Sequence, residues 1–178
     1  MKNRPKCLSI ESRAKSVLLR EEFGHWEGDL VVSSQKGKGA ILTLVERKTR
    51  FLISIKVPDR TQKSIALPID SIERKFGDLF TLVFKSITFD NGVEFNDPDL
   101  LRLSCYPHKR NRLGKGGRFA KLYYAHPFCS GERGSNENAN RMIRREFPKG
   151  TVFDIVSAVE LQAHVEWIND YPRRILGG

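Results

Sequence analysis

Three acidic residues stand where a carboxylate could bind a divalent metal ion. Asp90 ends an apolar, β-branched run, FKSITFD, and is followed by the turn-forming pair Asn91-Gly92. Asp29 lies within the strand-like stretch HWEGDLVV, and Glu137 lies in the polar cluster ERGSNENAN that opens a helical pattern. A strand that ends in a carboxylate suits a metal site, because the sheet fixes the backbone while the strand end opens to solvent. Two cations that share a phosphate need about three to four carboxylates, so these residues are candidates for one site.

The helical pattern from Asn136 separates its residues by face. At about 100° per residue, Glu137, Arg141 and Arg144 fall on one side of the helix. The opposite stripe is apolar and consists of Ala139, Met142, Ile143 and Phe147. A carboxylate with two arginines on the following turns can hold a cation and the phosphodiester that the cation activates. A Glu and Arg pair four residues apart is also common on solvated helix faces, and this interpretation stays open.

Asp29 belongs to the first of three predicted consecutive strands. Each of the three stretches is rich in β-branched and apolar residues, and short polar or glycine-containing links separate them. Strands joined by such short links form an antiparallel meander. The patterns cover about residues 25–32, 40–46 and 51–57.

The strand that ends at Asp90 follows a predicted helix. Apolar residues recur at helical spacing from Thr61, and Gly77 is a stop signal. A strand, helix, strand connection is what parallel pairing requires. Further patterns predict a short helix at 98–103, a strand at 122–125, and helices at about 136–147 and 155–170. The sequence therefore predicts an α/β protein with a mixed five-stranded sheet, three antiparallel strands followed by two parallel additions, flanked by helices.

The composition favours one domain with an anionic partner. At 178 residues, with 39% apolar and 29% charged residues, the chain is long enough to close a core. Residues 1–20 have a basic, weakly patterned sequence that predicts a linker, and 21–178 form the predicted domain. A net charge of +10 and a pI near 9.7 make nucleic acid the first candidate partner. No apolar run approaches the ~18 residues of a membrane span, so we expect a cytoplasmic protein.

A basic segment interrupts the pattern between the fourth and fifth predicted strands. It includes an insertion at about residues 105–121 and contains no acid from His108 to Lys121. Lys109, Arg110 and Arg112 are candidates for contact with a DNA backbone, each phosphate contact adding about 0.9 to the salt dependence of binding. A solvated loop is the alternative, because runs of like charge are often only that.

Two short pairs of metal-ligand residue types bracket this basic segment. Cys105 and His108 precede it, and His126 and Cys129 follow it. Two Cys and two His suit tetrahedral Zn²⁺, which could close the loop. Ordinary packing of the cysteines is the main alternative, and His126 could instead line a catalytic pocket. The three cysteines of the chain show no CxxC spacing, so we expect no disulfide framework.

Four stretches of the chain together resemble a known family. GHWEGD, ITFDNGVEF, ERGSNENANRMIRREFPKGT and INDYPRRILG are similar to the catalytic domain of transposases of the insertion-sequence-thirty family. These enzymes belong to the DDE transposases and retroviral-type integrases, which have an RNase H-like fold. The resemblance spans almost the whole chain from about Ile10. It implies a DNA transposase that cleaves element ends and transfers strands by phosphoryl transfer.

The resemblance implies roles for residues that match the motifs. Asp29, Asp90 and Glu137 become the catalytic and metal-binding carboxylates, with carboxyl carbons expected within ~10 Å of one another. Two Mg²⁺ ions are the implied cofactors, Mn²⁺ being a substitute, and double-stranded DNA is the implied partner of a chain that forms a homo-oligomer on DNA. Basic residues after the third acid become DNA-binding candidates: Arg141, Arg144, Arg145 and Lys149.

Some residues depart from the family pattern or compete for these roles. Between Asp90 and Glu137 there are 46 residues, more than is usual in the family, and the excess corresponds to the basic segment. Gly131 stands where the family usually has tryptophan. Glu132 is the rival of Glu137, and Glu27 could support Asp29 from the same strand face. A DNA-binding remnant without catalysis and an RNase H-like nuclease remain alternative functions.

Overall fold

A six-stranded mixed sheet forms the centre of the protein in the computed structural model, which describes residues 8–110, 117–119, 121–126 and 134–172. The strand order is β1-β6-β5-β2-β3-β4. Neighbours pair in parallel from β1 to β2 and antiparallel from β2 to β4. The strands are β1 (Leu8–Ser9), β2 (His25–Val32), β3 (Ala40–Glu46), β4 (Leu52–Val57), β5 (Ser86–Phe89) and β6 (Lys121–Tyr124).

The predicted meander is present as β2, β3 and β4. All seven residues of β3 are buried, because β3 has a strand on each side and helices over both faces. Such a strand reads as a nearly continuous apolar run rather than an alternating one, which explains the sequence AILTLVE. Thr43 is the polar residue inside that run, which ends at Glu46, and it lies directly opposite Asp29 in the β2–β3 register.

The predicted crossover is also present. Helix α2 (Gln62–Phe76) begins after Thr61, whose side chain accepts the N–H of Ser64, and ends before Gly77, whose positive φ of 56° suits glycine. The chain then differs from the simple strand pattern, because 77–79 and α3 (Phe80–Val83) are helical before β5 begins. A short helix α4 (Pro98–Arg102) follows, with Asp97 as its N-cap.

Helix α2 covers one face of the sheet, which we call the α2 face. An aromatic column fills this face: Trp26 stacks on Phe84 with ring centroids 4.4 Å apart, and Phe84 stacks on Phe80 at 4.7 Å. Phe89 stacks in the same way on Phe95 at 4.4 Å. These rings belong to one buried cluster, so the α2 face is the larger apolar core.

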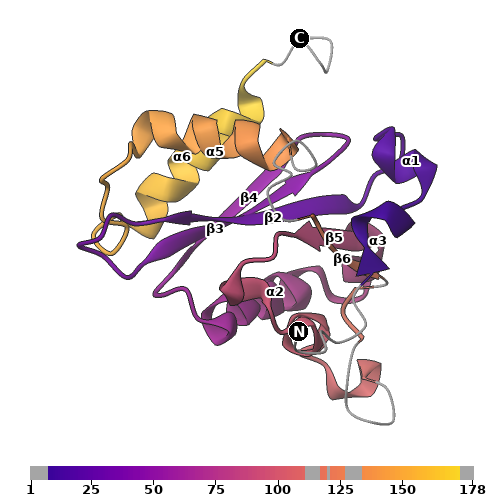
Figure 1. Ribbon diagram of the computed structural model, residues 1–178. Helices are drawn as coiled ribbons and strands as arrows, with labels where there is room; N and C mark the ends of the chain where they lie inside the picture. The colour runs from indigo at the N-terminus through magenta and orange to yellow at the C-terminus, as the bar shows by residue number, and fades with distance from the viewer. Residues whose placement is uncertain (1–7, 111–116, 120, 127–133, 173–178) are drawn as a thin grey trace.

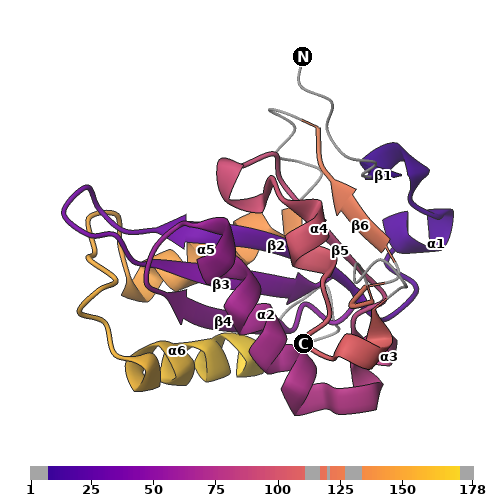
Figure 2. The ribbon, with the colours of Figure 1, turned by 90° about the horizontal axis from the view of Figure 1, so that it is seen from below.

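Helices α5 (Gly134–Glu146) and α6 (Ala158–Asp170) cover the opposite face, which we call the α5 face. Figure 1 shows both helices on one side of the sheet and α2 on the other, and Figure 2 shows the same layers from below. The core here joins residues of β2, β3 and β4 to the apolar stripe of α5 and to α6. Ser157 caps α6, so the helix begins at Ala158, three residues after the predicted start, and Ile155 is exposed.

Residues 8–20, which we expected to form part of a linker, pack against the sheet in this structure. Strand β1 adds a sixth strand in parallel to β6, and η1 (Ile10–Ser12) and α1 (Lys15–Leu18) follow it. Ile10 and Val17 are buried, at 5% and 4% exposure. The sequence pattern missed this packing because two apolar contacts spaced seven residues apart are too few to mark an element.

Candidate active site

Asp29 and Asp90 lie side by side at the end of the parallel pair β2 and β5. The last registered pair is Glu27 with Thr88, so Asp29 and Asp90 each lie two residues beyond it on neighbouring strands. Adjacent strands are about 4.8 Å apart, and residues two apart share a face. Val31 belongs to the core beneath α5, which places Asp29 on the α5 face. The structure therefore brings the first two predicted carboxylates to one strand edge.

Gly28 allows this close approach of the two strands. A Cβ atom at Gly28 would lie 2.1 Å from the Phe89 ring, so any side chain there would displace the ring. Phe89 precedes Asp90 and is fully buried on the α2 face. The glycine before Asp29 and the phenylalanine before Asp90 thus fit together as one contact.

Hydrogen bonds to neighbouring backbone groups hold the turn after Asp90. The Asp90 carboxylate accepts the N–H of Gly92 at 2.8 Å, and Asn91 donates to the carbonyl oxygen of Ala125. Tyr124 donates to the carbonyl oxygen of Phe95, at the end of the same turn. The Tyr124 side chain at the end of β6 and the backbone carbonyl of Ala125 after it therefore fix the loop that carries Asp90.

Helix α5 contacts Asp29 through Asn140. The Asn140 amide donates to Asp29 Oδ2 at 2.8 Å, and its oxygen accepts the Thr43 hydroxyl at 3.2 Å. Thr43 Oγ1 also lies 3.3 Å from the Asp29 carbonyl oxygen. Neither Asn140 nor Thr43 was among the site residues predicted from the sequence. A polar residue inside the apolar run of β3 and an asparagine three residues after Glu137 were the available signals.

Glu27 holds the first turn of α5. Its carboxylate is fully buried and accepts the backbone N–H groups of Ser135 and Asn136, each at 3.1 Å. It also pairs with Arg47, whose side chain is only 5% exposed. The first N–H groups of a helix have no partner within the helix, and a carboxylate is favoured at that end. Glu27 therefore supports the site by fixing α5 rather than by facing it beside Asp29.

Burial lowers the pKa of the Arg47 guanidinium, Glu27 raises it, and the nearby Arg20 lowers it further. Arg47 also donates to the carbonyl oxygen of Val17 at 3.3 Å. The buried pair of Arg47 and Glu27 thus connects residues 8–20, which we call the lead-in, to the sheet and the start of α5. A buried pair of this kind is sensitive to loss of either partner.

Glu137 lies on the side of α5 that faces away from α6. Ala139, Met142 and Ile143 pack with α6, whereas Glu137 and Arg141 are exposed. Within the described residues, no group of three or more His, Cys, Asp or Glu side chains is close enough to hold a metal. The convergence of Glu137 with the two aspartates therefore stays a prediction. Glu132 lies outside the described residues.

The four basic residues after Glu137 divide into two kinds. Arg144 donates to the Val32 carbonyl oxygen at 2.8 Å and to the carbonyl oxygens of Phe147 and Pro148 at 3.3 Å. Burial lowers its pKa. Arg144 therefore holds the end of α5 against β2. The other three, Arg141, Arg145 and Lys149, are exposed.

The basic segment is largely paired with the protein itself where the structure describes it. Lys109 lies 3.1 Å from an Asp78 carboxylate oxygen, and Arg110 donates to the Ser104 carbonyl oxygen at 2.8 Å. Arg118 is 1% exposed and pairs with Asp70 and Glu73 of α2. Burial lowers the pKa of Arg118 to about 10. Arg112, the other DNA-binding candidate, lies outside the described residues.

The predicted zinc ligands that the structure describes contact different parts of the protein. Cys105 donates its backbone N–H to Glu73, and burial raises the pKa of its thiol. His108 is exposed next to Tyr106, and His126 faces Glu11, with Nε2 3.5 Å from Oε1. Cys129 lies outside the described residues. The described residues thus give Cys105 and His126 other neighbours, and the zinc hypothesis gains no support from them.

The sheet order and its helices define the fold class as that of integrase catalytic cores. The crystal structure of the catalytic core domain of BIV integrase matches the chain with a TM-score of 0.57 at 18% identity. The match covers 85% of this chain and 87% of that one. At such low identity the likeness shows the fold alone, and it confirms the predicted RNase H-like architecture. No family model matches the chain.

Proteins of similar sequence narrow the fold class to a family of homologues. The probable transposase of element IS1161 from Streptococcus salivarius is 32% identical over 170 residues, covering 95% of this chain and 43% of that protein. Transposase InsI of IS30A from Escherichia coli is 32% identical, covering 94% and 39%. The transposase of IS1086 from Cupriavidus metallidurans is 31% identical, covering 97% and 46%. The homologues of this chain are therefore transposases of the IS30 family, as the motifs predicted.

The chain spans less than half the length of these curated relatives. The aligned part contains all three predicted acidic motifs, because it covers almost the whole chain. Among the described residues, no helix is long and apolar enough to cross a membrane.

Proposed function

We propose that the chain is the catalytic domain of a DNA transposase that cleaves element ends and transfers strands by metal-dependent phosphoryl transfer. The observation that carries the proposal is the pair Asp29 and Asp90, which lie two residues past the last registered pair of the parallel strands β2 and β5, with α5 bonded to Asp29 through Asn140. Homology to transposases supports a polynucleotidyl transferase chemistry. The bound partner would be the duplex DNA of an element end and of a target.

Each residue has a distinct part in this proposal. Asp29 and Asp90 would hold the metal, and Glu137 would complete the group from the exposed side of α5. Asn140 and Thr43 orient the Asp29 carboxylate through the bonds described above. A carboxylate oxygen accepts from more than one direction, so the Asn140 bond and a coordinated ion are compatible.

The proposed cofactor is Mg²⁺, as two ions, or Mn²⁺ in its place. When bound, these ions would polarise the scissile phosphate and lower the pKa of the attacking water. Hard oxygen ligands on adjacent strands suit these ions. The chain itself would position the DNA at the metal-binding carboxylates. The exposed cations Arg141, Arg145 and Lys149 follow Glu137 along the chain and would contact backbone phosphates.

The proposal places the enzyme on chromosomal DNA in the cytoplasm, as a homo-oligomer that pairs two ends. Two carboxylates at one strand edge would serve both hydrolysis, which releases a 3′-hydroxyl, and the attack of that hydroxyl on a target phosphodiester. No covalent enzyme intermediate is required, because water and DNA hydroxyls are the nucleophiles.

A cleavage and strand-transfer assay tests the proposal. Labelled duplexes that carry the ends of the element encoding this chain are incubated with Mg²⁺ or Mn²⁺, with the wild type and with Asp90→Asn. We expect Asp90→Asn to lose at least ~10³-fold in rate, because a metal-held phosphate is worth several kcal/mol in the transition state.

Glu94→Gln is the matched control, since it removes an acid four residues from Asp90 that we assign no catalytic part. It should retain cleavage. Persistence of cleavage in Asp90→Asn, or equal loss in Glu94→Gln, would reject the assignment. Duplex binding without cleavage in the wild type would favour the alternative function, a DNA-binding remnant without catalysis.

A further inference from the structure

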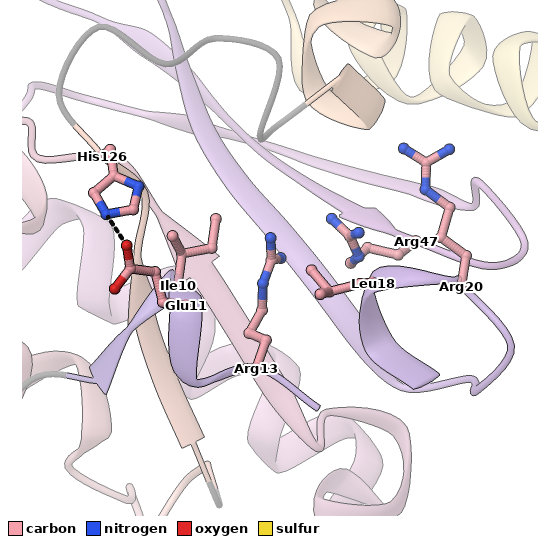
Figure 3. Close-up of a pocket in the computed structure, with 7 residues that line it drawn as sticks. All are labelled: Ile10, Glu11, Arg13, Leu18, Arg20, Arg47 and His126. Atoms are coloured by element: carbon pink, nitrogen blue, oxygen red, sulfur yellow. Dashed lines mark ion pairs between the residues drawn. The ribbon is translucent and has the colours of Figure 1, made fainter. Parts of the chain in front are cut away.

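A basic pocket lies between the lead-in and the α5 face of the sheet. It has a volume of about 450 Å³ and is lined by Ile10, Glu11, Arg13, Leu18, Arg20, Arg47 and His126. Figure 3 shows the guanidinium groups of Arg13, Arg47 and Arg20 in a row across it. The pocket is formed only because residues 8–20 pack on the sheet, so it was not visible in the sequence.

The pocket carries an excess of positive charge. Three arginines line it, against one acid, Glu11, whose side chain is 77% exposed and faces His126. Glu27 compensates Arg47 from the sheet side. In the described part of the chain no ion pair holds the Arg20 side chain, and its charge lies close enough to Arg47 to lower the pKa of that guanidinium. An anion in the pocket would relieve this repulsion.

The pocket adjoins the proposed catalytic carboxylates. Arg13 donates to Thr88 Oγ1 at 3.4 Å, and Thr88 lies two residues before Asp90 on β5. Arg47 pairs with Glu27, two residues before Asp29 on β2. Two residues along a strand span about 6.7 Å. One strand of duplex DNA advances about 3.4 Å along the axis per phosphate, so the next one or two phosphates from the scissile one would come to this pocket.

We propose that this pocket binds a backbone phosphate of the DNA strand that is cleaved, through Arg20 and the adjacent arginines. Guanidinium groups suit phosphate because their planar N–H donors bind two oxygens at once. The proposal rests on the proposed function, since it takes duplex DNA as the substrate. It adds the lead-in to the surfaces that place that substrate.

Arg20 is the residue to change, because Arg13 and Arg47 also hold the fold. Its φ is 60°, a left-handed conformation that asparagine tolerates better than most side chains. Arg20→Asn therefore removes the charge and the reach without new backbone strain. Lys63→Gln is the matched control, because Lys63 is exposed on α2, on the other face of the sheet. It changes the net charge equally.

The measurement is the affinity for a labelled 30-base-pair duplex in EDTA across a salt titration. Arg20→Asn should lower the slope of log K against log salt by about 0.9 and weaken binding about eightfold at 0.1 M salt relative to the wild type. Lys63→Gln should leave the slope unchanged. Arg20→Lys, which keeps the charge, should restore the slope.

An unchanged slope in Arg20→Asn, or an equal decrease in Lys63→Gln, would overturn the proposal. A pocket that binds only small anions would also overturn it. In that case inorganic phosphate would raise the melting temperature of the wild type but not of Arg20→Asn, while the salt slope of duplex binding would be the same for both proteins. Because binding is measured in EDTA, the result is separate from catalysis. A wild type that cleaves DNA while Arg20→Asn keeps its slope would reject the pocket and leave the proposed function intact.

Discussion

The two basic regions of the chain differ in what their charges face. In the basic segment, Lys109 and Arg118 pair with acids at Asp78, Asp70 and Glu73. In the lead-in pocket, Arg20 has no such partner among the described residues, whereas Arg47 pairs with the buried Glu27. The difference teaches that a run of cations in the sequence need not be a DNA-binding surface. The position of acids from distant parts of the chain decides which cations remain for a partner.

The largest expected effect comes from breaking the pairing in the basic segment. Arg118→Met should cost about 4 kcal/mol of unfolding free energy, because it leaves the buried Glu73 without its cation. Urea denaturation measures this loss. The double variant Arg118→Met with Glu73→Gln should lose less than the sum of the single variants, as coupled partners do. Additive losses would show that Arg118 only fills space.

Arg47 combines both behaviours, since it lines the pocket and pairs with Glu27. Glu27→Ala should cost about 3 kcal/mol, because it leaves a buried guanidinium and two N–H groups of α5 without an acceptor. Glu27→Gln, which keeps an oxygen for the N–H groups, should cost less.

Cleavage assays at a temperature where both Glu27 variants are folded separate stability from positioning. We expect Glu27→Ala to reduce the rate more than Glu27→Gln, because only the alanine releases the start of the helix that carries Glu137. Equal rates for the two variants would contradict a positioning role.

A smaller effect is expected from the exposed part of the basic segment. Lys109→Ala with Arg110→Ala should change the salt slope of duplex binding by less than ~0.9, because both side chains already bond to oxygen atoms of the protein. The same salt titration as for Arg20→Asn measures it. A decrease near ~1.8 would mean that DNA displaces both internal bonds, and the contrast between the two regions would then fail.

The smallest effect concerns an acid before α2, the helix that supplies Asp70 and Glu73. Hydrogen bonds from Ser64 and Thr61 lower the pKa of Asp59 from 3.8 to about 2. A depressed pKa stabilises the fold above pH 3.8, and this contribution is lost as the pH falls towards 2. The melting temperature of the wild type should therefore fall relative to that of Asp59→Asn over this window. A constant difference between the two proteins would contradict the assignment.

The sequence predicted those elements whose signals are local. Helix α2 begins after its Thr61 cap and ends at Gly77 as expected, and the meander follows the apolar runs. The parallel direction of β5 also followed, because a crossover helix implies parallel pairing, whereas its place beside β2 did not. These features depend on residues close together in the chain.

Contacts between distant segments could not be predicted in the same way. Glu27 meets Ser135 across 108 positions, and Arg118 meets Glu73 across 45. Nothing in the composition around either residue names its partner, since buried ion pairs depend on tertiary packing. The lead-in likewise offered only Ile10 and Val17 as apolar contacts. The structure was therefore needed to separate paired cations from available ones.

The bonds from α5 to β2 occur every four residues along the helix and every two to three residues along the strand. Asn136 meets Glu27, Asn140 meets Asp29 and Arg144 meets Val32, so each step of four helix residues follows the strand forward. Four helix residues rise about 6.0 Å and two strand residues about 6.7 Å, which keeps the first two contacts aligned. A one-residue deletion between Asn136 and Arg144 would rotate the rest of the helix by about 100° and break the later contacts together. Evolution of this lineage should therefore conserve the length of this helical segment more strictly than the identity of its exposed residues.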